Sequence, residues 1–207
     1  MEITLSRPLR NHWFALRHGQ SKANVAQVVV SDPANGCNGH GLTEIGREQF
    51  QQSLSAIALA KLGSAAPDSQ TLLYSSDFAR AIESAAVAAE LLQIEREVQI
   101  DTRLRERFFG RYELGDASAY EKVWQADRGN INTAEHGVEP VHSVALRMTQ
   151  LVKTLEQQHH NQTIVLVSHG DPLQILECVF SDHPLARHRD LAPLENAELR
   201  LLGAPQR

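Results

Sequence analysis

The stretch from His12 to Ser21 reads HWFALRHGQS, an apolar run that leads into an arginine, a histidine and a glycine. The run His12–Leu16 predicts a buried β-strand, because it is short, partly aromatic and bounded by polar residues. Gly19 allows a ligand to approach the backbone closely, and Ser21 can cap a helix whose N–H groups face an anion. Since ligands of open α/β sheets bind beyond the carboxyl ends of the strands, this stretch predicts an anion site.

Two other predicted strands end in residues of the same kind. Thr163–Val167 predicts a strand that is followed by a second His-Gly pair, beginning at His169. Thr71–Tyr74 predicts a strand that leads into a helix with Arg80 in its first turn. Because the carboxyl ends of parallel strands meet at one edge of a sheet, we expect these side chains to converge. The candidate site residues that these strand ends supply are Arg17, His18, Arg80 and His169.

Helical patterns separate the strands. They cover Glu44–Leu62, Asp77–Leu92, Val141–Gln158 and Leu173–Phe180. Expected N-caps are Thr43 for the first helix, Ser76 or Asp77 for the second, and Asp171, followed by a proline, for the last. Strands that alternate with helices predict an α/β fold with a mainly parallel sheet that helices cover on both faces.

One stretch departs from this regular alternation. Residues 108–140 are rich in Gly, Asp, Glu and Asn and show little periodicity. A long insertion of this kind is often a lid or a binding loop, so we expect an irregular lid or substrate-specificity segment there. The sequence shows no convincing domain boundary, and residues 1–207 are predicted to form a single domain.

Composition narrows the class of partner. A net charge of -5 and a pI near 6.0 argue against a nucleic-acid partner. No apolar run is long enough to cross a bilayer and no leader pattern opens the chain, so no membrane partner is expected. Two cysteines, Cys37 and Cys178, are too few for a disulfide framework, which favours a reducing cytoplasmic location. Nothing in the sequence indicates an oligomeric state.

The ordered set of motifs resembles the histidine phosphatase (phosphoglycerate mutase-like) superfamily. The motifs that carry the resemblance are Arg17-His18-Gly19 with Asn24, Gly41-Leu42-Thr43 with Gly46, Ser75-Ser76-Asp77 with Arg80, Glu106, and Ser168-His169-Gly170. The resemblance implies a three-layer α/β/α sandwich around a mainly parallel sheet with one antiparallel edge strand. It also implies that His18 is phosphorylated during turnover and that Glu106 is the proton donor. The phosphate pocket that it implies consists of Arg17, Asn24, Arg80 and His169.

Physical chemistry supports these roles independently. A neutral imidazole is a competent nucleophile near neutral pH, and a backbone carbonyl on its other nitrogen would fix the tautomer. Arg17 and Arg80 can neutralise the oxygens of a phosphoryl group with paired N–H donors, and His169 would add a donor if it is protonated. These groups can replace a metal ion, so we expect no metal and no cofactor. The predicted function is metal-independent hydrolysis of a small phosphorylated metabolite.

Departure of an alkoxide requires a general acid. Glu106 is the candidate, because Phe108 and Phe109 beside it could supply the desolvation that keeps a carboxyl group protonated. An isolated glutamate between two arginines is more often a solvated surface residue. Only its place in the ordered set of motifs makes Glu106 a candidate.

Two alternatives remain open at the level of sequence. A cofactor-dependent mutase would need a second anion site, for which Arg105, Arg107 and Arg111 are candidates, but the insertion is short and mostly acidic or neutral. A catalytically silent phosphate-binding protein would need no nucleophile aligned with an acid. Outside the motifs, His183, His188 and the arginines around them are interpreted as a polar loop and tail.

Overall fold

A sheet of five strands forms the centre of the protein. The computed structural model describes residues 3–55, 59–60 and 63–205. Within them the strand order is β3-β2-β4-β1-β5. The strands are β1 (His12–Arg17), β2 (Leu72–Ser75), β3 (Gln99–Ile100), β4 (Thr163–Ser168) and β5 (Leu199–Gly203). Neighbouring strands are parallel except β5, which runs antiparallel to β1 at one edge.

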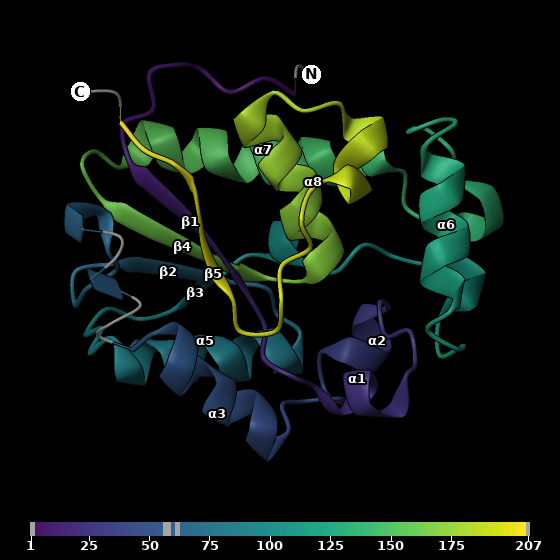
Figure 1. Cartoon of the computed structure of the whole chain (residues 1–207), viewed down its shortest axis with the longest axis horizontal. Helices are drawn as coiled ribbons and strands as arrows, with labels where there is room; N and C mark the ends of the chain where they lie inside the picture. The colour runs from purple at the N-terminus through teal and green to yellow at the C-terminus, as the bar shows by residue number, and fades with distance from the viewer. Residues whose placement is uncertain (1–2, 56–58, 61–62, 206–207) are drawn as a thin grey trace.

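Helices cover both faces of this sheet (Figure 1). Helices α3 (Glu44–Ser53) and α5 (Ala79–Leu91) lie on one face, and α7 (Val141–Gln158) and α8 (Gly170–Ser181) lie on the other. The predicted three-layer α/β/α sandwich, with a mainly parallel sheet and one antiparallel edge strand, is confirmed.

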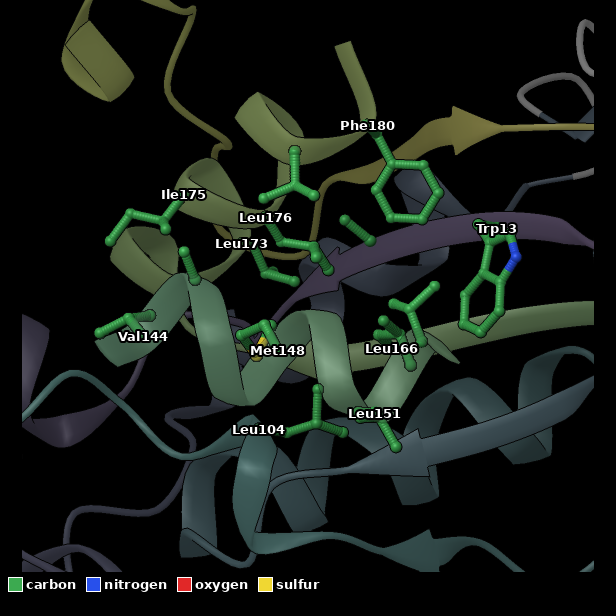
Figure 2. Packing of buried hydrophobic residues seen from close by; sticks show 14 of the residues in the cluster. Trp13, Leu104, Val144, Met148, Leu151, Leu166, Leu173, Ile175, Leu176 and Phe180 are labelled. Carbon is green, nitrogen blue, oxygen red and sulfur yellow. The ribbon is translucent and has the colours of Figure 1, made fainter. Parts of the chain in front are cut away.

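The layers follow from the alternation of side chains along the strands. In β1, Trp13 enters the hydrophobic cluster formed with α7 and α8, whereas its neighbour Phe14 enters the cluster formed with α3 and α5. Met148 of α7 and Leu173 of α8 pack on the first cluster (Figure 2). Both faces of the central strands are therefore apolar, which explains why each reads as a continuous hydrophobic run.

The insertion at residues 108–140 contains more regular structure than predicted. Residues Ala119–Asp127 form helix α6, so the prediction of an irregular segment is wrong there. Val123 of α6 packs with Val29, Phe109 and Val138 in a third hydrophobic cluster. The other short elements are α1 (Lys22–Ala26), α2 (Pro33–Gly36) and the 3-10 helices η1 (Gly63–Ala65), η2 (Thr102–Leu104), η3 (Gly110–Tyr112), η4 (Glu135–Gly137) and η5 (Leu185–Asp190).

Several predicted helix ends need correction. Helix α3 ends at Ser53 rather than Leu62; residues 59–60 are again helical, and 56–58 and 61–62 lie outside the described residues. The N-cap of α5 is Phe78 rather than Ser76 or Asp77. Helix α8 begins at Gly170 with His169 as its N-cap, which places Asp171 inside the first turn. The predicted cap of α3 at Thr43 is confirmed, since its side chain accepts from the backbone N–H of Gly46 at 3.0 Å.

Strand register brings the motif residues to one edge of the sheet. Arg17 of β1 pairs with Ser168 of β4, and Ser75 of β2 pairs with Val167. The backbone N–H of His18 donates to the carbonyl of Ser168 at 3.0 Å, just past the last pair of β1. His18 and His169 therefore leave adjacent strands at the same level.

No helix among the described residues is long and apolar enough to cross a membrane. Cys37 and Cys178 are free thiols. The cytoplasmic location and the single domain stay predictions.

Candidate active site

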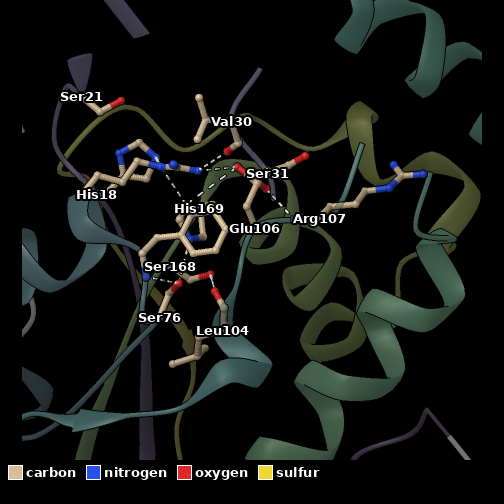
Figure 3. Close-up of polar contacts among 12 residues, drawn as sticks. His18, Ser21, Val30, Ser31, Ser76, Leu104, Glu106, Arg107, Ser168 and His169 are labelled. Carbon is tan, nitrogen blue, oxygen red and sulfur yellow. Dashed lines mark hydrogen bonds and ion pairs between the residues drawn. The ribbon is translucent and has the colours of Figure 1, made fainter. Parts of the chain in front are cut away.

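His18 is buried at the carboxyl end of β1, close to His169 (Figure 3). Its Nδ1 lies 2.7 Å from the carbonyl oxygen of Gly19, which accepts a hydrogen bond and fixes the proton on Nδ1. The lone pair is then on Nε2, which accepts from the Arg80 Nε–H at 3.2 Å. Burial, followed by the charges of Arg80 and Arg17, lowers the pKa of His18 well below its usual value. The ring is therefore neutral, with its nucleophilic nitrogen directed at Arg80.

Arg17 and Arg80 line one cavity of about 160 Å³ together with His18. The Arg17 Nη1–H donates to the carbonyl of Leu194 at 2.6 Å, and the Arg80 Nη2–H donates to that of Val30 at 3.0 Å. Among the described residues, Nε of Arg17 and Nη1 of Arg80 are buried without a hydrogen-bond acceptor. Buried donors on charged groups are costly to leave unpaired. The arrangement therefore suits an anionic ligand with several acceptor oxygens.

His169 is fully buried beside His18, with their ring centroids 5.2 Å apart. Its Nε2–H donates to the hydroxyl of Ser76 at 3.0 Å, and its Nδ1 accepts from the Arg80 Nε–H at 3.1 Å. Burial, then the Arg80 charge, lowers the pKa of His169 well below its usual value. His169 is therefore neutral here and positions Arg80; direct contact with a substrate stays a prediction.

Glu106 lies on the same cavity, and its carboxyl group is nearly buried. One carboxyl oxygen accepts from the backbone N–H of Arg107 at 2.9 Å, and the other lies 3.7 Å from Arg80 Nη2. Burial raises the pKa of Glu106 to about 7; Arg80 opposes this rise and the nearby Asp171 carboxylate supports it. A carboxyl group with this pKa can hold a proton near neutral pH and release it in the reaction.

The predicted source of that desolvation is wrong in part. Phe108 is 37% exposed, so it does not shield the carboxyl group from water. Phe109 is buried, but it packs edge-on against Tyr120 at 4.7 Å between ring centroids. Tyr120 and Trp124 of α6 line the cavity with Glu106. The shielding therefore comes from the packed insertion rather than from one sequence neighbour.

Asn24 also lines the cavity, from helix α1. Its side-chain oxygen accepts from the Ser21 backbone N–H at 3.0 Å, while the Ser21 hydroxyl accepts from the Asn24 N–H at 3.2 Å. This reciprocal capping confirms the predicted cap at Ser21 and orients Asn24 toward the mouth of the cavity. All six predicted site residues thus gather at one place, five on the cavity wall and His169 behind Arg80.

Sequence reasoning missed a buried ionic network beside the cavity. Arg107 donates to both oxygens of Asp127, at 2.7 and 2.8 Å, and to Asp171 at 3.2 Å. His188 is 1% exposed, with Nε2 3.5 Å from Asp171, so its interpretation as part of a polar loop is wrong. Burial alone would raise the pKa of Asp171, but the close contact with His188 and the Arg107 charge hold it below the usual range. No sequence signal links these residues, because they come from four separate segments.

Helix α7 contacts the backbone of the segment that carries Glu106. Arg147 of α7 donates to the Glu106 carbonyl at 3.4 Å and to both carboxyl oxygens of Glu139, at 2.8 and 3.1 Å.

In the part of the chain that the structure describes, no group of three or more His, Cys, Asp or Glu side chains could hold a metal ion. Independence from a metal stays a prediction for experiment.

The fold and the site together define a class of protein: an α/β sandwich in which two histidines, two arginines and a buried glutamate meet beyond the strand ends. Residues 13–206 match the family model described as the histidine phosphatase superfamily (branch 1). The chain belongs to the histidine phosphatase superfamily, as its motifs implied. No curated protein matches the sequence.

Solved structures agree with this assignment. A mycobacterial glucosyl-3-phosphoglycerate phosphatase in complex with VO3 is 27% identical, with a TM-score of 0.69, over 93% of this chain and 96% of that chain. A structure described as mycobacterial hydrolase 1 is 28% identical, with a TM-score of 0.71, over 92% of this chain and 87% of that one. A phosphoserine phosphatase mutant from Entamoeba histolytica, in complex with phosphoserine, shares the fold at 20% identity and a TM-score of 0.70, with 91% and 88% of the two chains covered.

Proposed function

We propose that this protein is a metal-independent phosphatase that hydrolyses a small phosphorylated metabolite through a phosphohistidine at His18. One observation carries the proposal. Nε2 of His18 carries no proton, and it lies in the same site as two buried arginine N–H donors that have no acceptor among the described residues. Glu106, with a pKa of about 7, lies on the same cavity as the proton donor. The mycobacterial structure with VO3 is that of a phosphatase, which supports the same reaction class here.

The first step forms a bond between His18 Nε2 and phosphorus and breaks the bond from phosphorus to the leaving oxygen. Glu106 gives its proton to that oxygen, so the alcohol leaves neutral and Glu106 becomes a carboxylate. Arg17 and Arg80 neutralise charge on the equatorial oxygens. The Nδ1–H bond to Gly19 lets the phosphorylated ring keep its other proton.

The second step is hydrolysis of the phosphoenzyme. The Glu106 carboxylate takes a proton from water, the water oxygen attacks phosphorus, and the bond from phosphorus to Nε2 breaks with its electron pair returning to the ring. Inorganic phosphate leaves, and both residues regain their starting protonation states. This balance needs no co-reactant other than water.

The three arginines that the sequence offered for the second anion of a mutase all have other partners. Arg105 binds the Asp77 carboxylate at 2.9 Å, Arg107 is buried against Asp127, and Arg111 bonds to the exposed His136 at 2.8 Å. None of these three arginines lines the cavity. A silent phosphate binder would have no use for a glutamate whose pKa is raised to about 7.

The test is release of 4-nitrophenol from its phosphate in the presence of EDTA. We expect activity in the wild type and none in His18→Ala, because the variant has no nucleophile. His160→Ala is the matched control: His160 is exposed, its ring contacts Arg10 at 3.5 Å and it does not line the cavity, so wild-type activity is expected. Loss of wild-type activity in EDTA would contradict metal independence, and an acid-labile phosphoenzyme that persists in His18→Asn would contradict the assignment of the nucleophile.

A further inference from the structure

A third arginine lines the cavity and is used by neither step of the proposed reaction. Arg189, from the 3-10 helix η5, shares the cavity with Arg17 and Arg80, and its side chain is 22% exposed. Burial lowers the pKa of Arg189, the Asp171 carboxylate opposes this, and the positive charge of Arg17 lowers it further. The positive charges of Arg17 and Arg189 therefore repel each other, and the acidic residues that line the same cavity are Asp171 and Glu106.

Aromatic stacking holds this guanidinium in place. Its central carbon lies 3.7 Å from the ring centroid of Trp124. Trp124 also stacks on Tyr120, with centroids 5.6 Å apart and planes 18° apart, and its Nε1–H donates to Asp171 at 3.0 Å. Because Trp124 is already engaged by these partners, its role is to position Arg189 rather than to stack on a ring of the substrate.

The hydrogen bonds of Arg189 leave one edge of the guanidinium open. Nη1 donates to the side-chain oxygen of Gln174, and Gln174 is itself fixed by donating to the Leu191 carbonyl at 2.6 Å. Nη1 is 4.0 Å from Asp171, whose oxygens accept from Trp124 and Arg107. Within the described part of the chain, Nε and Nη2 of Arg189 make no hydrogen bond.

The edge formed by Nε and Nη2 binds a carboxylate at two other arginines of this protein. Arg105 donates to Asp77 from Nε at 2.9 Å and from Nη2 at 2.5 Å. Arg103 donates to Asp101 from the same two atoms, at 2.9 and 2.6 Å. This paired geometry matches the two oxygens of a carboxylate. Arg189 lines the same cavity, of about 160 Å³, as Arg17 and Arg80.

We propose that Arg189 is a specificity-determining residue that binds a carboxylate of the substrate, so that the preferred substrates are small phosphomonoesters that also carry a carboxylate. The inference rests on the proposed phosphatase function. It assigns the leaving-group end of the cavity to Arg189 and the phosphoryl end to Arg17 and Arg80. Trp124 and Gln174 act through Arg189 as positioning residues.

The test compares substrate pairs that differ in the carboxylate. The pairs are 3-phosphoglycerate with glycerol 3-phosphate, and phosphoserine with phosphoethanolamine. In the wild type we expect kcat/KM to be about 10- to 100-fold higher for the carboxylate member of at least one pair, the range of a charge-assisted hydrogen-bonded pair. Arg189→Gln should bring that ratio close to one, mainly through KM, and Arg189→Lys should recover only part of it because it lacks the paired donors.

The matched control is Arg187→Gln, an exposed arginine of the same 3-10 helix that does not line the cavity; the ratio should stay at its wild-type value. Two results would overturn the inference: equal kcat/KM for both members of each pair in the wild type, or equal losses of kcat/KM for both members in Arg189→Gln. Hydrolysis of 4-nitrophenyl phosphate would still support the phosphatase proposal in either case. If the wild type hydrolyses nothing, calorimetry with 3-phosphoglycerate and glycerol 3-phosphate decides. Tighter binding of 3-phosphoglycerate that Arg189→Gln abolishes would then support the carboxylate site at Arg189, although the phosphatase proposal had failed. Equal binding of the two compounds would overturn the carboxylate site.

Discussion

Glu106 stands between two arginines in the chain, a setting that by itself indicates a solvated carboxylate. In the fold both arginines turn to other partners: Arg105 binds Asp77 and Arg107 binds Asp127. Glu106 is left in a buried place, with one carboxyl oxygen 3.7 Å from Nη2 of Arg80. Desolvation therefore outweighs the attraction of the arginines, and the pKa rises to about 7.

The raised pKa predicts how activity depends on pH. An acid works only while protonated, so kcat/KM for an alkyl phosphate should fall as pH rises through about 7. The pKa of His18 is lowered, so the nucleophile stays neutral and causes no loss near pH 6.5. Glu106→Gln should abolish the loss of activity above neutral pH. It should also reduce kcat by about 10²- to 10⁴-fold on an alkyl phosphate, with a smaller reduction on an aryl phosphate. If the activity of Glu106→Gln still declined with rising pH as that of the wild type does, another group would be the acid.

At the scale of elements, the loop after β1 is held against helix α3 by two glycines. A Cβ on Gly19 would lie 2.2 Å from the carbonyl oxygen of Gly46, and a Cβ on Gly46 would lie 2.1 Å from that of Gln20. The Gly19 N–H also donates to Ser84 of α5 at 3.1 Å. Close backbone contact between these segments therefore fixes the position of His18.

Gly46→Ala tests this contact. Alanine is the better helix former by about 1 kcal/mol, so propensity alone predicts stabilisation. We expect the opposite, a loss of about 1–3 kcal/mol in the free energy of unfolding, because the new methyl group meets backbone atoms. Activity should fall by about 100-fold as the loop that carries His18 moves. Urea denaturation and the 4-nitrophenyl phosphate assay measure both effects. Gly129→Ala is the control, since its Cβ would meet only Ala126 at 3.4 Å; equal behaviour of the two variants would contradict the role of the contact.

At the scale of the whole molecule, the Arg107 network joins the insertion to the sandwich. Arg107 follows η2, Asp127 ends α6, Asp171 is in the first turn of α8, and His188 belongs to η5. All four side chains are buried. The network holds α6, and with it Tyr120 and Trp124, over the cavity.

Asp127→Asn should weaken this connection strongly. The substitution leaves the buried Arg107 charge with Asp171 as its remaining ionic partner among the residues that the structure describes. Breaking a buried pair in this way typically lowers the free energy of unfolding by about 3–5 kcal/mol. Asp190→Asn is the matched control, because Asp190 pairs with Arg128 at 2.9 Å where both side chains are exposed; its loss should be below about 1 kcal/mol. Urea unfolding curves of the two variants give the comparison. Similar losses would mean that the buried network contributes no more than a surface pair.

Much of the fold and of the phosphoryl end of the site was predictable from local sequence. The apolar runs of β1, β2 and β4 mark strands because each packs against an apolar cluster on both faces of the sheet, and chain direction then places His18, Arg80 and His169 at one edge. The short β3 has only two residues, both exposed, so no apolar pattern could reveal it. Strand β5 was expected only through the resemblance to a family.

What the sequence by itself determined is therefore the set of reactive groups and the edge of the sheet where they gather. Only the tertiary structure decided their protonation and their neighbours. The pKa of Glu106 depends on burial beside a cavity that Tyr120 and Trp124 of α6 also line, and the position of Arg189 depends on stacking against Trp124, which lies far from it in the sequence. Such long-range contacts leave no periodic pattern in the sequence, because they arise only when separate elements pack around the same cavity.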